Sequence, residues 1–353
     1  MTTSDASRPD RVAEPVRKPP SGELPPIEPP TVGFILQLFV IPLVIVSIIV
    51  VVWLLFNWLA HMGTNPTELV RDLRKMNDAS WQKALTLADL LRNPQSAELK
   101  RDAALAKEVA AVLEDQLDKA PTDDSNLVQL RVFLCRALGE FEVADVLPTL
   151  LRAAGTQRAE QDLQVRRSAV QSLAVYIDHN EPAELQQQEE LVEVLLRASR
   201  EQQNPDPEFG MAELRSTAAY ALGMLGGEQV QERLVTMLDD GYPNARFNAA
   251  LALCRHGDER ALPVLLEMLD PESDEAVRHE TAEEGKPWKR LLVLQNGIRA
   301  AQMLATHNAT ADLSQLVEAL NTLAKSELSK LEPGTRRGVH MEAQEAVLKL
   351  GPR

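Results

Sequence analysis

The chain has 353 residues, of which 25% are charged and only 4% are aromatic, and its formal net charge is −15. Abundant Ala, Leu, Glu and Gln favour helix, whereas strands are usually richer in β-branched and aromatic residues. An acidic chain of this kind repels nucleic acids and anionic lipid headgroups, and no basic stripe or aromatic stacking platform appears in it. The composition therefore predicts an all-α protein and excludes nucleic-acid binding.

The first 30 residues hold eight prolines among Ser, Glu and Arg. Such a mixture cannot pack a core and prefers extended, solvated conformations. We therefore expect residues 1–30 to form a disordered Pro-rich tail. Its polyproline character is compatible with binding a small recognition domain, but no clear PxxP ligand with flanking charge stands out, so a linker is the favoured interpretation.

The next segment, VGFILQLFVIPLVIVSIIVVVWLLFNWLA, begins at Val32, and the chain carries no charged residue between Glu28 and Glu68. At about 1.5 Å per residue, such a helix exceeds the roughly 30 Å hydrocarbon core of a bilayer. Pro42 should kink it, and Trp53 and Trp58 suit the interface at its far end. We expect residues 32–61 to form one transmembrane helix through the lipid bilayer. A cleaved signal peptide fits less well, because the apolar segment is too long and no small-residue cleavage site follows it.

The side of the membrane on which the rest of the chain lies is weakly determined by charge, since two basic residues stand close before the span and three close after it. That small excess favours a cytoplasmic location for residues 65–353. Cys135 and Cys254 agree with it. Both lie in Ala/Leu-rich helical patterns, where buried free thiols are expected rather than a redox pair.

A sequence pattern recurs within residues 65–353: an Arg, a small or apolar residue three positions on, a small residue six on and Leu seven on. These positions share one helix face, and small residues there let a neighbouring helix approach closely. The expected repeat-packing sets are Arg131, Leu134, Ala137 and Leu138; Arg166, Ala169, Ser172 and Leu173; Arg215, Ala218, Ala221 and Leu222; and Arg246, Ala249, Ala252 and Leu253. Weaker matches without the Arg start at Trp81, Gly297 and His340, as terminal or modified repeats often do.

Each such helix is followed by a second amphipathic one. In RFNAALALCRHGDERALPVLLEMLD, Gly257 can close the first helix and Asp258 can cap the second. The spacing between units varies, so longer loops or helices interrupt the array. The candidate interruptions are residues 178–188, 204–209 and 270–284.

The units LRSTAAYALGMLGGEQVQERLVTMLDD and ARFNAALALCRHGDERALPVLLEMLD resemble HEAT repeats, in the variant also found in phycobilisome lyases. Pro148 and Pro263 resemble the proline that this family places early in its second helix. The block LPPIEPPTVGFILQLFVIPLVIV before the repeats further resembles single-span HEAT proteins of planctomycete-type bacteria. The resemblance covers about residues 65–350 and implies a right-handed α-solenoid of HEAT-like helix pairs. It is specific for fold and poor for function, because HEAT arrays share packing residues while their binding residues vary.

No catalytic, metal-binding or cofactor-binding residue is predicted, and no small-molecule substrate. The six histidines are scattered, without an HExxH pattern. HEAT-type deoxyhypusine hydroxylases carry repeated His-Glu pairs for two irons, whereas this chain has the single pair His279-Glu280. No GxSxG elbow or glycine-rich phosphate loop is present, and the acidic residues 270–284 lack the order of a calcium-binding EF-hand.

Binding is the remaining function. The resemblance implies that the second helices line a concave surface, on which a partner helix or extended peptide can lie. The candidate partner-binding residues are charged positions of those helices: Arg152, Arg197, Glu232, Arg233, Glu259, Arg260 and Glu267. Ordinary solvated charges are the alternative interpretation for each. The sequence favours a membrane-anchored HEAT-repeat scaffold or adaptor for a partner protein of unknown identity. The alternatives are an enzyme or enzyme subunit of the HEAT-type lyase or hydroxylase kind, and a structural envelope protein.

Overall fold

The computed structural model describes residues 32–61, 66–75, 77, 79–158, 160, 162–200 and 210–351. The chain divides into two compact units, residues 1–63 and 64–353. Helices build both units, and the described residues contain no strand, so the predicted all-α fold is confirmed. The tail predicted for residues 1–30 lies outside the described residues.

The first unit contains a single described helix, α1 (Val32–His61), which continues without interruption through Pro42. Its stretch Leu36–Phe56 has a mean hydropathy of 3.2, and none of it is buried. By length and composition this helix can cross a membrane. The side chain of Trp58 lies outside the described residues, while Trp53 is exposed.

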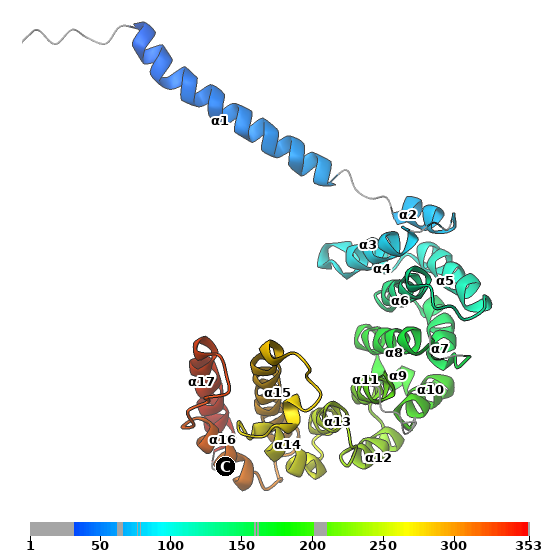
Figure 1. The fold of residues 1–353 in the computed structure, drawn as a ribbon, viewed down its shortest axis with the longest axis vertical. Helices are drawn as coiled ribbons and strands as arrows, with labels where there is room; N and C mark the ends of the chain where they lie inside the picture. Colours follow the sequence, from blue (N-terminus) through cyan, green and yellow to red (C-terminus); the bar gives the residue numbers. More distant parts are fainter. Residues whose placement is uncertain are drawn as a thin grey trace, which may run out of the picture. The chain divides into compact units, whose positions relative to one another are not determined.

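The second unit is a stack of helix pairs arranged in two rows along an arc (Figure 1). The inner row, on the open side of the arc, consists of α3 (Ser80–Arg92), α6 (Ser125–Gly139), α8 (Asp162–His179), α11 (Gly210–Leu225), α13 (Pro243–Arg255), α15 (Lys286–His307) and α17 (Pro333–Leu350). The outer row consists of α5 (Ala103–Asp118), α7 (Leu147–Gly155), α10 (Glu189–Arg200), α12 (Glu228–Met237), α14 (Leu262–Leu269) and α16 (Ser314–Leu323).

Short helices complete the second unit. The α-helical ones are α2 (Pro66–Leu73), α4 (Ala97–Lys100) and α9 (Pro182–Leu185). The 3-10 turns are η1 (Pro94–Ser96), η2 (Ala144–Val146), η3 (Glu259–Ala261), η4 (Glu275–Val277) and η5 (Glu283–Gly285). Helix α2 buries Leu69, Val70 and Leu73 against α3 and α5, and so covers the first layer of the stack.

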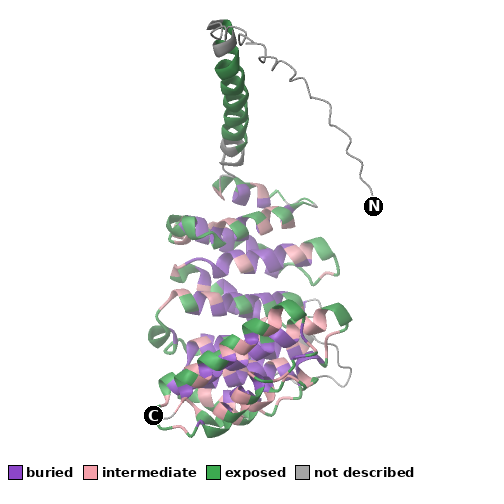
Figure 2. Cartoon of the chain, turned by 90° about the vertical axis from the view of Figure 1, so that its left-hand side faces the viewer, coloured by how far each residue is buried: buried purple, intermediate pink, exposed green. Residues whose placement is uncertain are grey.

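The hydrophobic core runs through the stack from layer to layer, with exposed residues around it (Figure 2). The small and aliphatic residues of the repeat pattern lie in this core: Ala137, Leu138, Leu173, Ala221, Leu222 and Leu253 are 0% exposed and Ala252 is 2% exposed. Each helix pair thus covers the apolar face of the next, as a solenoid requires.

The curvature follows from the unequal packing of the two rows. Successive inner helices pack against each other along much of their length, whereas neighbouring outer helices touch at few points. A Cβ built at Gly139 would lie 2.7 Å from the Ser172 Cβ, and one at Gly223 would lie 2.4 Å from the Ala252 Cβ. Because glycine has no side chain, the inner helices approach each other more closely at these positions than an alanine would allow. The inner row is therefore the more closely spaced one, and the stack bends toward it.

The repeated Arg caps the end of an outer helix. Arg131 donates to the carbonyl of Ala120, just beyond α5, at 3.3 Å, and Arg166 donates to the carbonyl of Ala154 in α7 at 3.3 Å. The last carbonyls of a helix lack intrahelical partners and carry a partial negative charge. The cations at this position of α6 and α8 therefore hold the preceding outer helices in place, whereas Arg215 of α11 binds Asp240, beyond the following outer helix.

In two layers that lack the Arg at the expected position, another side chain contacts a carbonyl beyond the preceding outer helix. In the last layer, His340 stands where the repeat pattern has Arg, and its Nε2 lies 2.9 Å from the carbonyl oxygen of Ser326, beyond α16. In the layer before it, α15 begins well before Gly297, and Arg290 donates to the Pro271 carbonyl beyond α14 at 3.3 Å. The capping Arg of α15 lies two helical turns before Gly297, outside the seven-residue span of the repeat pattern.

Candidate interaction surface

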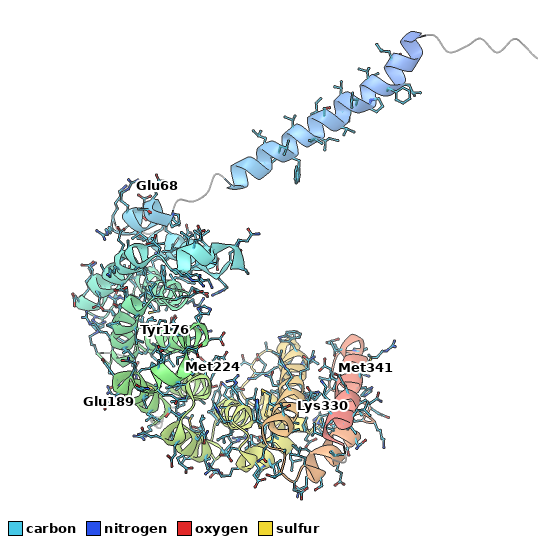
Figure 3. All side chains as sticks on the ribbon, turned by 180° about the vertical axis from the view of Figure 1, so that it is seen from behind. Glu68, Tyr176, Glu189, Met224, Lys330 and Met341 are labelled. Atoms are coloured by element: carbon cyan, nitrogen blue, oxygen red, sulfur yellow. The ribbon has the colours of Figure 1, made fainter. Side chains whose placement is uncertain are left out.

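A stripe of half-buried side chains around the exposed Tyr220 follows α11 on the open side of the arc. Glu213, Thr217, Tyr220 and Met224 are spaced by three or four residues and so lie on one helix face. Figure 3 shows Met224 on the open side of the arc. Tyr220 is 46% exposed, which is unusual for a tyrosine on a helix packed on two sides.

The neighbouring inner helices repeat this stripe. On α13 the aligned residues are Asn244, Asn248, Leu251 and Arg255, all half-buried. On α8 they are Gln164, Gln171 and Val175, together with the buried Ser168. We call the exposed and half-buried residues of this set, on α8, α11 and α13, the inner stripe.

Amide and apolar side chains dominate the inner stripe. The amide of Asn248 donates to the Ser216 carbonyl at 2.9 Å, and that of Asn244 donates to the Tyr242 hydroxyl at 3.1 Å. No hydrogen bond between described residues engages the side-chain oxygen of Asn244 or Asn248, so each oxygen can accept from a ligand. The carboxylate of Glu213 is paired with Arg167, so its charge is balanced.

The outer row and the turn η3 before α14 carry the seven charged residues that the sequence singles out. Arg152 of α7 binds Glu114 and Asp118 of α5, with 2.5 Å to Asp118 Oδ1. Hydrogen bonds that Arg152 donates to the carboxylates of Asp118 and Glu114 raise the pKa of its guanidinium. This side chain bridges two consecutive outer helices.

Other charges of the outer row are engaged in the same way. Arg260 binds Glu232 of α12 at 2.9 Å and also Asp258, while Arg233 donates from Nε to the Ser199 hydroxyl of α10 at 2.9 Å. Of the other three charged residues, Glu267 binds Arg246 at 2.6 Å, Arg197 binds Glu193 at 2.8 Å, and Glu259 is exposed. Six of the seven therefore make contacts within the chain, most of them between helices. A role for them in binding a partner remains a prediction.

The expectation that second helices line the concave surface is wrong. The second helix of each pair lies in the outer row, and the Arg-bearing first helix faces the open side (Figure 1). The small residues of the first helices let these helices pack closely against each other. Because an arc bends toward its more closely spaced row, the first helices form the inner row.

Two cysteines and one histidine of the second unit are packed against other residues of the stack. Burial raises the pKa of the Cys135 and Cys254 thiols to about 12, which confirms buried, inert free cysteines. His279 packs against Tyr242 with ring centroids 5.2 Å apart, and burial lowers its pKa. Within the part of the chain that the structure describes, no three His, Cys, Asp or Glu side chains gather to hold a metal ion.

Comparison with known proteins agrees with this architecture. A family model of HEAT repeats matches residues 202–284, the segment that contains α11, α12, α13 and α14. The matched segment lies within the all-helical, HEAT-like solenoid that the second unit forms. The chain is also similar to the phycocyanobilin lyase subunit alpha of Picosynechococcus sp., with 30% identity over 160 residues, which are 45% of this chain and 55% of that protein. The chain thus spans about half the length of the curated relative it matches.

Proposed function

We propose that this protein is a membrane-anchored HEAT-repeat scaffold that binds a partner protein on the inner stripe. The supporting observation is the contrast between the two rows of helices. The inner stripe presents an exposed tyrosine, apolar side chains and fixed amides on three consecutive helices. The charges of the outer row are mostly engaged in contacts within the chain.

The composition of the inner stripe suits a protein interface. Interface cores are depleted in charged residues and enriched in Tyr and Met, and large aromatic side chains often carry much of the binding energy. A partner lying in the arc contacts α8, α11 and α13 together, so several weak contacts act at once. Free acceptor oxygens on Asn244 and Asn248 fit backbone N–H groups of such a partner.

The test replaces inner-stripe residues in the full chain. Tyr220→Arg and Leu251→Glu place charges where we infer an apolar contact, and each should reduce at least tenfold the partner recovered after cross-linking in native membranes. Arg197→Glu on α10 is the control, because among the described residues Arg197 pairs with Glu193 of the same helix, and it should leave recovery unchanged. Equal recovery from all variants would contradict the proposed surface.

Anchoring by α1 has a separate test. Leu36–Phe56 is apolar and fully exposed, so a bilayer would supply the contacts that its own unit does not. We expect the full chain to stay in the membrane pellet after alkaline carbonate extraction, and a chain lacking residues 32–61 to appear in the supernatant. Release of the full chain by carbonate would exclude a spanning helix.

A second candidate function comes from the similarity to the lyase subunit. By this alternative the chain is an enzyme subunit that handles a bilin. Mixing the purified full chain with phycocyanobilin and recording its absorbance separates the two functions: a spectral shift with stoichiometric binding favours the lyase-like function, and an unchanged spectrum favours the scaffold.

A further inference from the structure

The outer row contains a second surface with a different chemistry. A groove of about 530 Å³ separates α14 from α16. Its lining comes from the end of α14 and from one face of α16: Leu266, Leu269, Asp270, Pro271, Gln315, Glu318, Ala319 and Thr322. The apolar side chains of Leu266 and Ala319 are only partly buried by the rest of the chain.

The charge at this groove has one sign. Asp270 and Glu318 are exposed, no ion pair between described residues engages either carboxylate, and the lining contains no basic residue. The last carbonyls of α14 add partial negative charge at the Asp270 end. Two lysines follow α16 outside the lining: Lys325 is exposed, and Lys330 binds Asp274 at 3.1 Å.

A groove of equal size between α10 and α12 lacks this one-sided negative charge. That groove also has a volume of about 530 Å³, but Arg197 and Arg200 line it together with Glu189 and Glu193. Acidic and basic groups there balance each other. The α14–α16 groove therefore differs from it in electrostatics rather than in size.

The dimensions of the α14–α16 groove favour a helical occupant. Helix α16 has 10 residues. At about 1.5 Å per residue, ten residues span roughly 15 Å, or close to three turns. A third helix packs between two others by placing apolar side chains at i, i+3 or i+4, and i+7 into the space between them. Basic side chains flanking that apolar stripe would meet Asp270 on one side and Glu318 on the other.

We infer that the α14–α16 groove docks a short, basic amphipathic helix of a partner protein, at a site separate from the inner stripe. Leucine-like side chains of the partner would cover Leu266 and Ala319, and its lysines or arginines would pair with Asp270 and Glu318. The two surfaces lie on opposite rows of the stack, so both can be occupied at once.

The experiment uses the full chain in nanodiscs of zwitterionic lipid and a fluorescein-labelled 14-residue peptide of Leu and Lys, with Leu at i, i+3, i+4 and i+7. Binding is read by polarisation, with the signal of empty nanodiscs subtracted. Asp270→Lys/Glu318→Lys reverses the charge of the groove. Ala319→Phe fills part of the groove without changing its charge. Each variant should weaken peptide binding at least tenfold.

The matched control is Glu189→Lys/Glu193→Lys, the same charge change in the α10–α12 groove, which should alter the affinity less than twofold. A peptide with Glu in place of Lys should not bind. The inference is overturned if the Lys peptide does not bind above the empty nanodiscs, if the Glu peptide binds equally, or if the control variant loses as much affinity as the groove variants. Inner-stripe variants such as Tyr220→Arg should keep full peptide binding, so this result is independent of the proposed partner surface.

Discussion

Arg215→Ala should lower the free energy of unfolding by about 3–5 kcal/mol, because it leaves a buried carboxylate without its cation. Arg215 binds Asp240 through two parallel contacts, Nε to Oδ2 at 2.7 Å and a terminal nitrogen to Oδ1 at 2.8 Å. The two side chains are only 8% and 10% exposed. The loss is measured as the shift in the urea midpoint of helical circular dichroism of the full chain.

Two control variants separate this effect from a general loss of packing. Arg260→Ala removes an exposed arginine with two ion pairs and should cost less than about 1 kcal/mol. Arg215→Met/Asp240→Asn removes both charges while an oxygen remains to accept from the Tyr242 N–H, and should regain much of the loss. If Arg215→Ala and Arg260→Ala lowered the free energy of unfolding equally, burial of the Arg215–Asp240 pair would not account for the loss.

The pH dependence of the same pair has a defined sign. Burial alone would raise the pKa of Asp240, but hydrogen bonds from Arg215 and from the Tyr242 N–H outweigh it and hold the pKa below its usual value. The stability gained from this group is therefore present above the unfolded pKa of about 3.9 and is lost as the pH falls through the folded pKa. The deficit of Arg215→Ala should be full at neutral pH and shrink in acid.

Gly223→Ala should destabilise the protein by about 1–3 kcal/mol, even though Ala is favoured over Gly in a helix by about 1 kcal/mol. The added Cβ would lie 2.4 Å from the Ala252 Cβ and 3.1 Å from its Cα, so α11 and α13 must move apart. Thermal unfolding of the full chain, followed by circular dichroism, measures the loss.

A double variant tests this steric explanation directly. Ala252→Gly removes the methyl group that the new one meets, so Gly223→Ala/Ala252→Gly should be more stable than the sum of the two single changes predicts. Gly155→Ala in α7 is the matched control, since nothing lies within 4 Å of its added Cβ, and it should be neutral or slightly stabilising. Additive losses in the double variant would mean that the inner helices are not in close contact at this point.

Helix content and repeat packing were accessible from the sequence because they depend on local periodicity. Residues such as Ala137, Ala221 and Leu253 recur at fixed offsets from an Arg, and the structure buries them. The same pattern predicted the close approach of first helices that Gly139 and Gly223 now show.

The direction of curvature and the pairing of charges could not be predicted, because they depend on how helices that are distant in sequence are spaced in the stack. Arg152 meets Glu114 across 38 positions of sequence, and no local pattern relates them. The capping residue Arg290 was missed because α15 extends two turns beyond the repeat rule. A signal for the inner stripe did exist: aligned positions such as Gln171, Tyr220 and Leu251 fall on helices whose other faces are buried, yet vary in type among units.

The most direct test of the inner stripe as a binding surface is site-specific photo-cross-linking in native membranes, with a photoreactive side chain at position 220 in α11 or at position 193 in α10. We expect one defined protein adduct from position 220 and none from position 193. Adducts from position 193 alone, or the same adduct from both positions, would contradict a partner bound on the open side of the arc.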